Sequence, residues 1–193
     1  MIKNKDRSNY FGASDVDKIM GKWTSKTFAE WWIEKLGIFS KPFENIYTIA
    51  GTSWEHHILE SLKLNLEYDK QVIIEELKLR VNLDGNSADC IYECKTHRQD
   101  KPFNLPKKYI QQVNVQMYAL GVKKAKIVLY GLVTEDYKNF FAPIDNSRLQ
   151  IIDVPYDEHF IKRFIVRLKY LSKCLGQKKF PNENELEGKE CLT

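Results

Sequence analysis

The sequence predicts a mixed α/β fold in which helices cover a β-sheet. Three observations lead to this prediction. Apolar residues recur at helical spacing in the N-terminal third of the chain. Segments rich in β-branched and aromatic residues, typical of strands, follow in the middle. A helix then crosses from these segments into a nearly all-apolar strand, which completes a mixed α/β sandwich.

The bulk properties are those of one soluble domain. The chain has 193 residues, 43% of them hydrophobic and 29% charged, so we expect a single domain spanning residues 1–193. The start, MIKNKDRSNY, is polar and no apolar run approaches ~18 residues, so we expect no signal peptide, no membrane span and a cytoplasmic location. The net charge of +4 permits a nucleic-acid partner without requiring one. The four cysteines form no CxxC pair and are expected to be reduced, structural thiols.

Three helices are expected before the first strand. GASDVDKIMG suits a short helix that Ser14 caps and Gly21 ends. A second helix is expected from about Ser25 to Leu36, and a third from about Thr52 to Leu64. The tryptophans of this region are expected in the core, with base stacking as the alternative: Trp23, Trp31, Trp32 and Trp54.

Strands and helices alternate in the remainder of the chain. QVIIEELKLRVNL and CIYECKT read as consecutive strands, joined by the hairpin connection LDGNSAD. KKYIQQVNVQMYALG predicts a helix that follows Pro106 and ends at Gly121. AKIVLYGLV and RLQIIDVPY predict two further strands, before a long helix from about Asp157 to Leu175. Residues 181–193 are polar and are expected to form a loose tail.

Asp84, Glu93 and Lys95 form the pattern with the most chemical content. Alternation along CIYECKT places Glu93 and Lys95 on one face, opposite the cysteines, which indicates a wet, functional face that Asp84 can reach across the hairpin. Two carboxylates with backbone carbonyls suit Mg²⁺ or Mn²⁺, and such a metal lowers the pKa of bound water and stabilises charge on a phosphate. Lys95 can position or deprotonate the attacking water, or neutralise the phosphate. The alternative is a surface hairpin whose charges only face solvent.

These residues carry a family resemblance. Asp84…Glu93-Cys94-Lys95 resembles the PD-(D/E)xK nuclease motif, with Leu83 where the family often has proline. YIQQVNVQMYALG is similar to the glutamine-bearing helix of the YqaJ-type viral recombinase branch, the phage lambda exonuclease family. RSNYFGASDV resembles the phosphate-pocket segment of that branch and AGTSWEHHI its G-x-x-x-E helix, so the motifs cover roughly residues 7–121 in order. The resemblance implies a restriction-endonuclease-like α/β fold, a mixed β-sheet core flanked by helices.

The resemblance also implies roles for single residues. Asp84 and Glu93 would bind Mg²⁺, or Mn²⁺ as a substitute, through their carboxylates, and Cys94 through its backbone carbonyl. Lys95 would be the catalytic lysine, Glu55 would support the metal site and Gln112 would reach it from the crossing helix. Gln112 and Gln116 share a helix face, and solvent exposure is the alternative for both.

A second group of residues concerns the DNA end. Arg7 and Ser14 are the implied pocket for a terminal 5′-phosphate, since arginine offers a planar fork and a helix N-terminus offers free N–H groups. That branch has a further hydroxyl where this sequence has Gly12, so we expect weaker phosphate selection. Five lysines near the glutamine helix can line a phosphate track or simply face solvent: Lys107, Lys108, Lys123, Lys124 and Lys126.

The expected function is therefore that of a Mg²⁺-dependent deoxyribonuclease, a 5′-to-3′ exonuclease acting on linear double-stranded DNA in phage-type recombination. The resemblance implies a single-strand annealing partner and a ring-shaped homotrimer. An endonuclease or structure-specific nuclease on the same fold is the alternative, and a non-catalytic DNA-binding protein is the alternative of another class. His56 and His57 follow Glu55 without an HExxH arrangement, so zinc is not expected.

Overall fold

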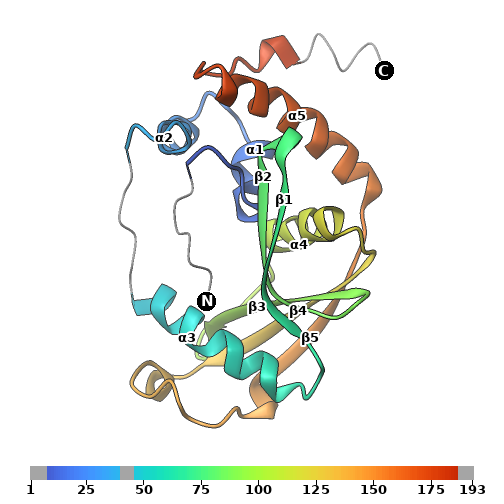
Figure 1. The fold of residues 1–193 in the computed structure, drawn as a ribbon. Helices are drawn as coiled ribbons and strands as arrows, with labels where there is room; N and C mark the ends of the chain where they lie inside the picture. The colour runs from blue at the N-terminus through green and yellow to red at the C-terminus, as the bar shows by residue number, and fades with distance from the viewer. Residues whose placement is uncertain (1–7, 40–45, 187–193) are drawn as a thin grey trace.

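The computed structural model describes residues 8–39 and 46–186. Within them lies a five-stranded sheet in the order β1-β2-β3-β4-β5 (Figure 1). The strands are β1 (Glu67–Ile74), β2 (Leu79–Asn86), β3 (Cys90–Arg98), β4 (Lys124–Leu132) and β5 (Leu149–Pro155). β3 and β4 run parallel, and the other neighbouring strands run antiparallel. β4 can run parallel to β3 because the helix between them returns the chain to the end of the sheet at which β3 begins.

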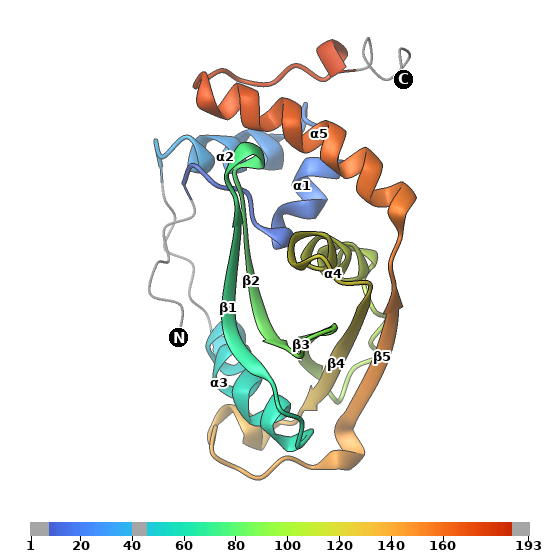
Figure 2. The same cartoon turned by 45° about the vertical axis from the view of Figure 1, so that its right-hand side comes forward.

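Helices cover both faces of the sheet (Figure 2). They are α1 (Val16–Met20), α2 (Lys26–Lys35), α3 (Ile46–Ser61), α4 (Lys107–Leu120) and α5 (Glu158–Gly176). One apolar core joins α1, α2, α4 and α5 to the sheet through residues such as Ile91 and Ile127. A second core joins α3 to the opposite face through Cys94 and Val128. The strand alternation of β3 therefore assigns its side chains to different cores.

Several helix ends follow signals in the sequence. The Ser25 hydroxyl accepts a hydrogen bond from the Phe28 N–H at 3.2 Å and starts α2. The Asp157 carboxylate does the same for the Phe160 N–H at 2.8 Å at the start of α5. Gly121 ends α4 with φ at 78°, a left-handed conformation that glycine adopts without steric cost. The four tryptophans of the N-terminal third are buried in the cores, as expected.

The first strand segment differs from the prediction. QVIIEELKLRVNL forms parts of two antiparallel strands, which a 3₁₀ turn at Glu75–Leu77 and a left-handed Lys78 (φ 47°) separate. The Asp84-Gly85 pair lies inside β2, and the connection to β3 occupies residues 87–89. Gly85 pairs with Tyr68 on one side and with Tyr92 on the other. A Cβ at this position would lie 3.2 Å from the Leu59 side chain, so close packing, not a turn, explains the glycine.

The segment after α5 is also packed more tightly than the sequence indicates. A loose tail was expected from residue 181, but residues 181–186 return to the helical core, where Leu186 is buried. Glu183 accepts from the Arg167 guanidinium at 2.8 Å and from the Trp23 N–H at 3.2 Å. These hydrogen bonds and the burial of Leu186 hold residues 181–186 against the core, although the segment is mostly polar. Residues 187–193 lie outside the described residues.

Two expectations about the whole chain can be compared with the described residues. Cys90, Cys94 and Cys174 are free thiols in buried positions, and Cys191 lies outside the described part. None of the helices that the structure describes is long and apolar enough to cross a membrane.

Candidate active site

The candidate site lies where β2 and β3 diverge. Registered pairing between these strands is limited to Gly85 with Tyr92 and Asn86 with Ile91. β3 pairs with β4 along its whole length, from Cys90 to Arg98. The edge of β3 that faces β2 therefore has unpaired backbone groups beyond Tyr92, and these need other partners. We call this opening the strand fork.

Asp84 supplies one of these partners. Its Oδ2 accepts a hydrogen bond from the Cys94 N–H at 2.8 Å, across the strand fork. The N–H and C=O of one strand residue project from the same edge, so the Cys94 carbonyl also faces the fork. The Cys94 thiol packs in the core under α3 instead. The structure thus brings Asp84 to the Cys94 N–H, and the role of the Cys94 carbonyl as a metal ligand stays a prediction.

Glu93 lies on the other face of β3, beneath α4. Its Oε1 accepts from the Lys95 ammonium and from the Gln112 amide, both at 2.5 Å. Its Oε2 accepts from the Gln116 amide, also at 2.5 Å. Glu93 is only 2% exposed, so the expectation of a wet face is wrong for this position. The reason is that α4 packs over the face of β3 that holds Glu93, which alternation alone does not reveal.

The carboxylates of the site crowd one another. Burial, then the charges of Glu93 and Glu55, raise the pKa of Asp84 well above its usual value. Burial and the charge of Glu93 raise the pKa of Glu55 to about 7. Burial alone would lower the pKa of Lys95, but the carboxylates of Glu93 and Asp84 outweigh it and raise that pKa. A site with excess buried negative charge is stabilised by a bound cation.

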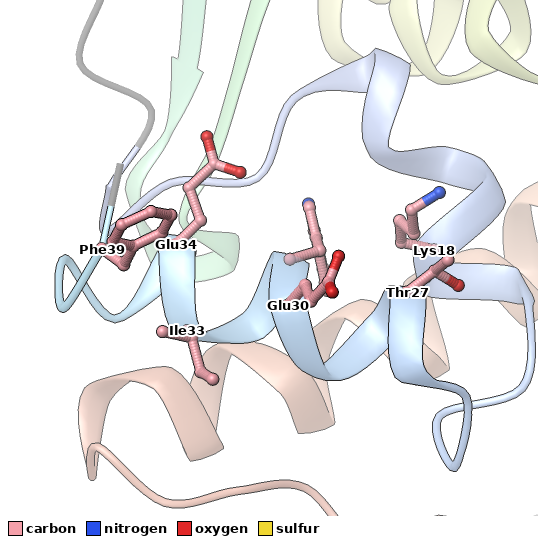
Figure 3. Close-up of a pocket in the computed structure, with 7 residues that line it drawn as sticks. Lys18, Thr27, Glu30, Ile33, Glu34 and Phe39 are labelled. Atoms are coloured by element: carbon pink, nitrogen blue, oxygen red, sulfur yellow. The ribbon is translucent and has the colours of Figure 1, made fainter. Parts of the chain in front are cut away.

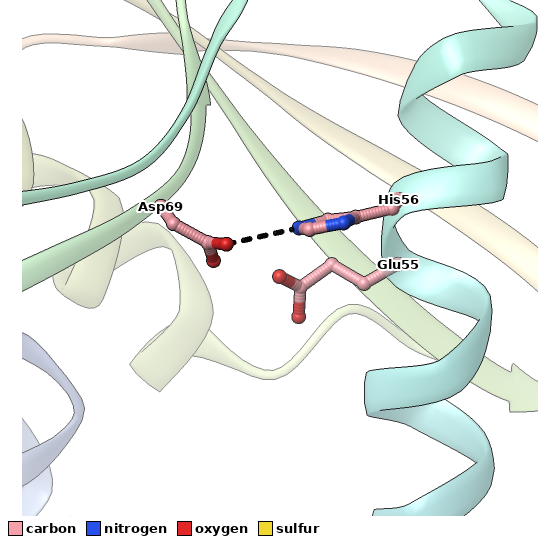
Figure 4. Close-up of side chains that lie close together, drawn as sticks. All are labelled: Glu55, His56 and Asp69. Atoms are coloured by element: carbon pink, nitrogen blue, oxygen red, sulfur yellow. Dashed lines mark ion pairs between the residues drawn. The ribbon is translucent and has the colours of Figure 1, made fainter. Parts of the chain in front are cut away.

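Glu55 reaches this site from α3, with two neighbours that Figure 4 shows. The carboxylates of Glu55 and Asp69 and the imidazole of His56 offer ligand atoms within 4.8 Å of one another. His56 Nε2 lies 3.4 Å from Asp69 Oδ2. Asp69 was not singled out from the sequence. It belongs to β1 and has φ at 56°, a conformation that no periodic pattern signals.

The donor set fits a hard divalent cation. The charge of Glu93 raises the pKa of both Asp84 and Glu55, and among the described residues the ligand atoms of Glu55, His56 and Asp69 form the group that lies within 4.8 Å of one another. Carboxylate oxygens suit Mg²⁺ or Mn²⁺ better than softer metals. The buried thiols do not enter the set, because their side chains lie in the cores.

The segment with Ser14 is built differently from the expectation. Ser14 is exposed in the 3₁₀ turn Ala13–Asp15. Gly12 comes immediately before this turn, and its N–H donates to Asp15 Oδ2 at 2.8 Å. The prediction that Ser14 caps a helix is therefore wrong: Gly12 is the residue before the turn, its N–H donates to Asp15, and Asp15 precedes α1 without a side-chain capping bond. Arg7 lies outside the described residues.

The five lysines around α4 divide into two groups. Lys124 pairs with Asp89 at 2.8 Å and Lys126 pairs with Asp153 at 2.5 Å. Lys123 lies over the ring of Tyr156. Lys107 and Lys108 begin α4, and both are exposed. Local partners thus engage the lysines at the start of β4, which favours the solvent-facing alternative for them.

A separate apolar groove of about 470 Å³ lies along α2 (Figure 3). The residues that line it are Lys18, Thr27, Glu30, Trp31, Ile33, Glu34 and Phe39. None of the site residues named above lines this groove.

The comparisons with known proteins concern the fold. No protein-family model matches the sequence, and no curated protein matches it. An alkaline exonuclease from Laribacter hongkongensis, LHK-Exo, superposes with a TM-score of 0.68 at 16% identity, over 95% of this chain and 93% of that one. The same enzyme in complex with dAMP gives 0.67 at 16% identity, over 94% and 91%. A phage-related exonuclease from Haemophilus somnus 129PT gives 0.62 at 16% identity, over 87% and 94%.

These values establish a shared architecture over nearly the whole of each chain. The mixed sheet flanked by helices is the restriction-endonuclease-like α/β fold that the sequence predicts. The structural likeness agrees with the resemblance to the lambda exonuclease branch, and the chain has the fold of these exonucleases.

Proposed function

We propose that the chain is a Mg²⁺-dependent deoxyribonuclease that acts as an exonuclease on linear double-stranded DNA. The observation that supports this proposal is the strand fork, where Asp84 accepts from the Cys94 N–H and Glu93 accepts from the Lys95 ammonium on the adjacent residues of β3. The likeness in fold to LHK-Exo, which has been crystallised with dAMP, supports the exonuclease alternative over a DNA-binding protein without activity.

In this proposal, each residue of the strand fork has a separate role in DNA hydrolysis. When bound, Mg²⁺ supplies an activated water and neutralises charge on the scissile phosphate. Asp84 and Glu93 would hold the cation through their carboxylates, and Glu55 would support the metal site from α3. Gln112 donates a hydrogen bond to Glu93 Oε1 and holds that oxygen in place. Because its pKa is raised, Lys95 keeps its proton at neutral pH and contributes positive charge to the phosphate as negative charge develops there.

End recognition and polarity form the finer part of the proposal. We propose 5′-to-3′ degradation that begins at a terminal 5′-phosphate, with Arg7 and the exposed Ser14 as its ligands. The family resemblance supports this assignment. It also supports a ring-shaped homotrimer and an annealing protein as partner, for which sedimentation and co-purification are the direct measurements.

Digestion of defined DNA substrates tests the proposal. Linear duplex labelled at one 5′ end and a covalently closed circle are incubated with the protein in Mg²⁺, Mn²⁺, Ca²⁺ or EDTA. We expect mononucleotides from the linear duplex with Mg²⁺ or Mn²⁺, an intact circle, and no products with Ca²⁺ or EDTA. Cutting of the circle would establish the endonuclease alternative. Binding without hydrolysis in every condition, with the Glu93→Gln variant as control, would establish the non-catalytic one.

A further inference from the structure

Gln116 contacts both strands of the fork from α4. It lies one turn after Gln112 and is 1% exposed. Its Nε2 donates to Glu93 Oε2 at 2.5 Å and to the Asn82 carbonyl of β2 at 3.3 Å. One amide group therefore connects β2, β3 and α4 at the point where β2 and β3 have stopped pairing with each other.

The other atom of this amide indicates why a glutamine stands here. Gln116 Oε1 is buried and has no hydrogen-bond partner among the described residues. A buried acceptor without a partner is unfavourable, and an apolar side chain of the same size would avoid that cost. The contacts of Nε2 are thus what a glutamine provides at this position and a methionine would not.

The two oxygens of Glu93 are held by different groups. Oε1 accepts from Lys95 and Gln112, whereas the donor on Oε2 is Gln116. Donors on one oxygen leave a carboxylate free to rotate about its last bond. A donor on the second oxygen fixes the plane of the carboxylate, and with it the direction of the lone pairs that a metal would use.

We propose that Gln116 is a positioning residue that fixes the Glu93 carboxylate for metal binding. This inference rests on the proposed function, because it requires Glu93 to be a metal ligand. Gln112 holds the same carboxylate near the Lys95 ammonium, and Gln116 holds it against β2. Hydrogen-bonding groups that orient a metal ligand typically change metal affinity about 10- to 100-fold when they are removed.

The test compares Gln116→Met with Gln111→Met. Methionine keeps the length and volume of glutamine and removes the amide. Gln111 lies on the same helix, and the donors to the Glu93 carboxylate are Lys95, Gln112 and Gln116, so the Gln111 variant is the matched control. Mg²⁺ binding is measured by calorimetry, the Mg²⁺ dependence of DNA hydrolysis by initial rates, and the melting temperature in EDTA by circular dichroism.

We expect the Mg²⁺ dissociation constant of Gln116→Met to rise about 10- to 100-fold, with the half-saturating Mg²⁺ concentration for hydrolysis rising in parallel. Excess Mg²⁺ should restore most of the rate, because the ligands themselves remain. Gln111→Met should match the wild type. A Gln116→Met protein that melts earlier but binds Mg²⁺ within twofold of the wild type would overturn the inference and leave Gln116 as a packing residue.

Two further measurements keep the inference testable. In wild-type protein with ¹⁵N-labelled glutamine, the buried amide of Gln116 should give exchange-protected N–H signals that shift when Mg²⁺ is added. Signals that do not respond to Mg²⁺ would contradict the proposed role even if Gln116→Met does not fold. A wild-type protein that neither binds Mg²⁺ nor hydrolyses DNA would instead contradict the proposed function itself.

Discussion

The positive charge of Lys95 is held in place by its neighbours. Its ammonium contacts Glu93 and lies 5.1 Å from the centre of the Tyr109 ring, an arrangement that attracts a cation. The side chain is one-fifth exposed. At the scale of single residues, this geometry makes Lys95 a group whose removal should strongly reduce hydrolysis.

Lys95→Ala should reduce the hydrolysis rate by about 100-fold or more, which is typical of a group that stabilises charge in a transition state. DNA binding should change little, whereas the melting temperature in EDTA should fall, because the buried Glu93 carboxylate loses its cation and keeps only its two amide donors. Initial rates on linear duplex measure the effect, and Lys101→Ala, at an exposed position after β3, is the control. Full activity of Lys95→Ala would remove the strand fork as the active site.

A substitution at Gly12 tests whether selection of a 5′-phosphate can be strengthened. A Cβ at this position would meet Ser14 Oγ at 3.5 Å and no closer atom, so a side chain fits. Gly12→Ser should place a second hydroxyl beside Ser14 and strengthen selection of a 5′-phosphate.

The measurement is the ratio of initial rates on linear duplex with 5′-phosphate and with 5′-hydroxyl. We expect a ratio above one in the wild type, a larger one in Gly12→Ser and a smaller one in Ser14→Ala. Gly12→Ala controls for the added Cβ. Equal rates on the two substrates for all four proteins would remove the 5′-end pocket and leave the nuclease proposal standing.

At the scale of elements, a buried ion pair joins the Ser14 segment to α2. Lys35, the last residue of α2, lies 2.7 Å from Asp15 Oδ2 and also donates to the Tyr10 carbonyl at 2.9 Å. Asp15 Oδ1 accepts from the Trp31 indole N–H at 3.0 Å. These contacts fix the 3₁₀ turn that carries Ser14 against the helical core.

Lys35→Met should destabilise the fold by about 3–5 kcal/mol, because it leaves the Asp15 carboxylate buried without its cation. Lys18→Met removes a partner from an exposed pair, Lys18 with Asp17, and should change stability by less than about 1 kcal/mol. Denaturant unfolding of both variants checks the contrast. Equal effects of the two substitutions would show that the buried pair does not hold the turn.

At the scale of the whole molecule, the crowded carboxylates link stability to pH and to metal. The pKa of Glu55 is raised to about 7 and that of Asp84 is also raised. A carboxyl group with a raised folded-state pKa binds its proton more tightly in the folded protein. Its contribution is therefore most favourable below the unfolded-state pKa and is lost as pH rises toward the folded-state pKa.

In EDTA, the melting temperature should fall as pH rises from about 5 to 8, with the Glu55 contribution centred below its pKa of about 7. Mg²⁺ should reverse this trend, since it binds the ionised carboxylates and stabilises the folded state. Glu55→Gln should flatten the EDTA profile and weaken the effect of Mg²⁺. A wild-type profile that is flat in EDTA and unaffected by Mg²⁺ would contradict a cation site at these residues.

Much of the architecture can be predicted because its signals are local. Ser25, Asp157 and Gly121 mark helix ends through contacts within a few residues. The alternation of CIYECKT correctly separates Glu93 from Cys94, because strand geometry alone decides on which face a side chain lies. The Asp-Gly pair misleads for the same reason. Its turn propensity is local, and pairing of Gly85 with two neighbouring strands overrides it.

The sequence by itself determined the α/β class, most of the helices and strands, and the face of β3 on which Glu93 lies; the membership of Asp84, Glu93, Lys95 and Gln112 in one active site stays a prediction. Only the tertiary structure decided that β2 and β3 diverge beside Asp84, that α4 buries Glu93 and that Gln116 holds its second oxygen. It alone brought Asp69 of β1 to Glu55 of α3. The physical reason is that strand register and helix packing decide which side chains meet. Both depend on contacts between segments that are far apart in the sequence.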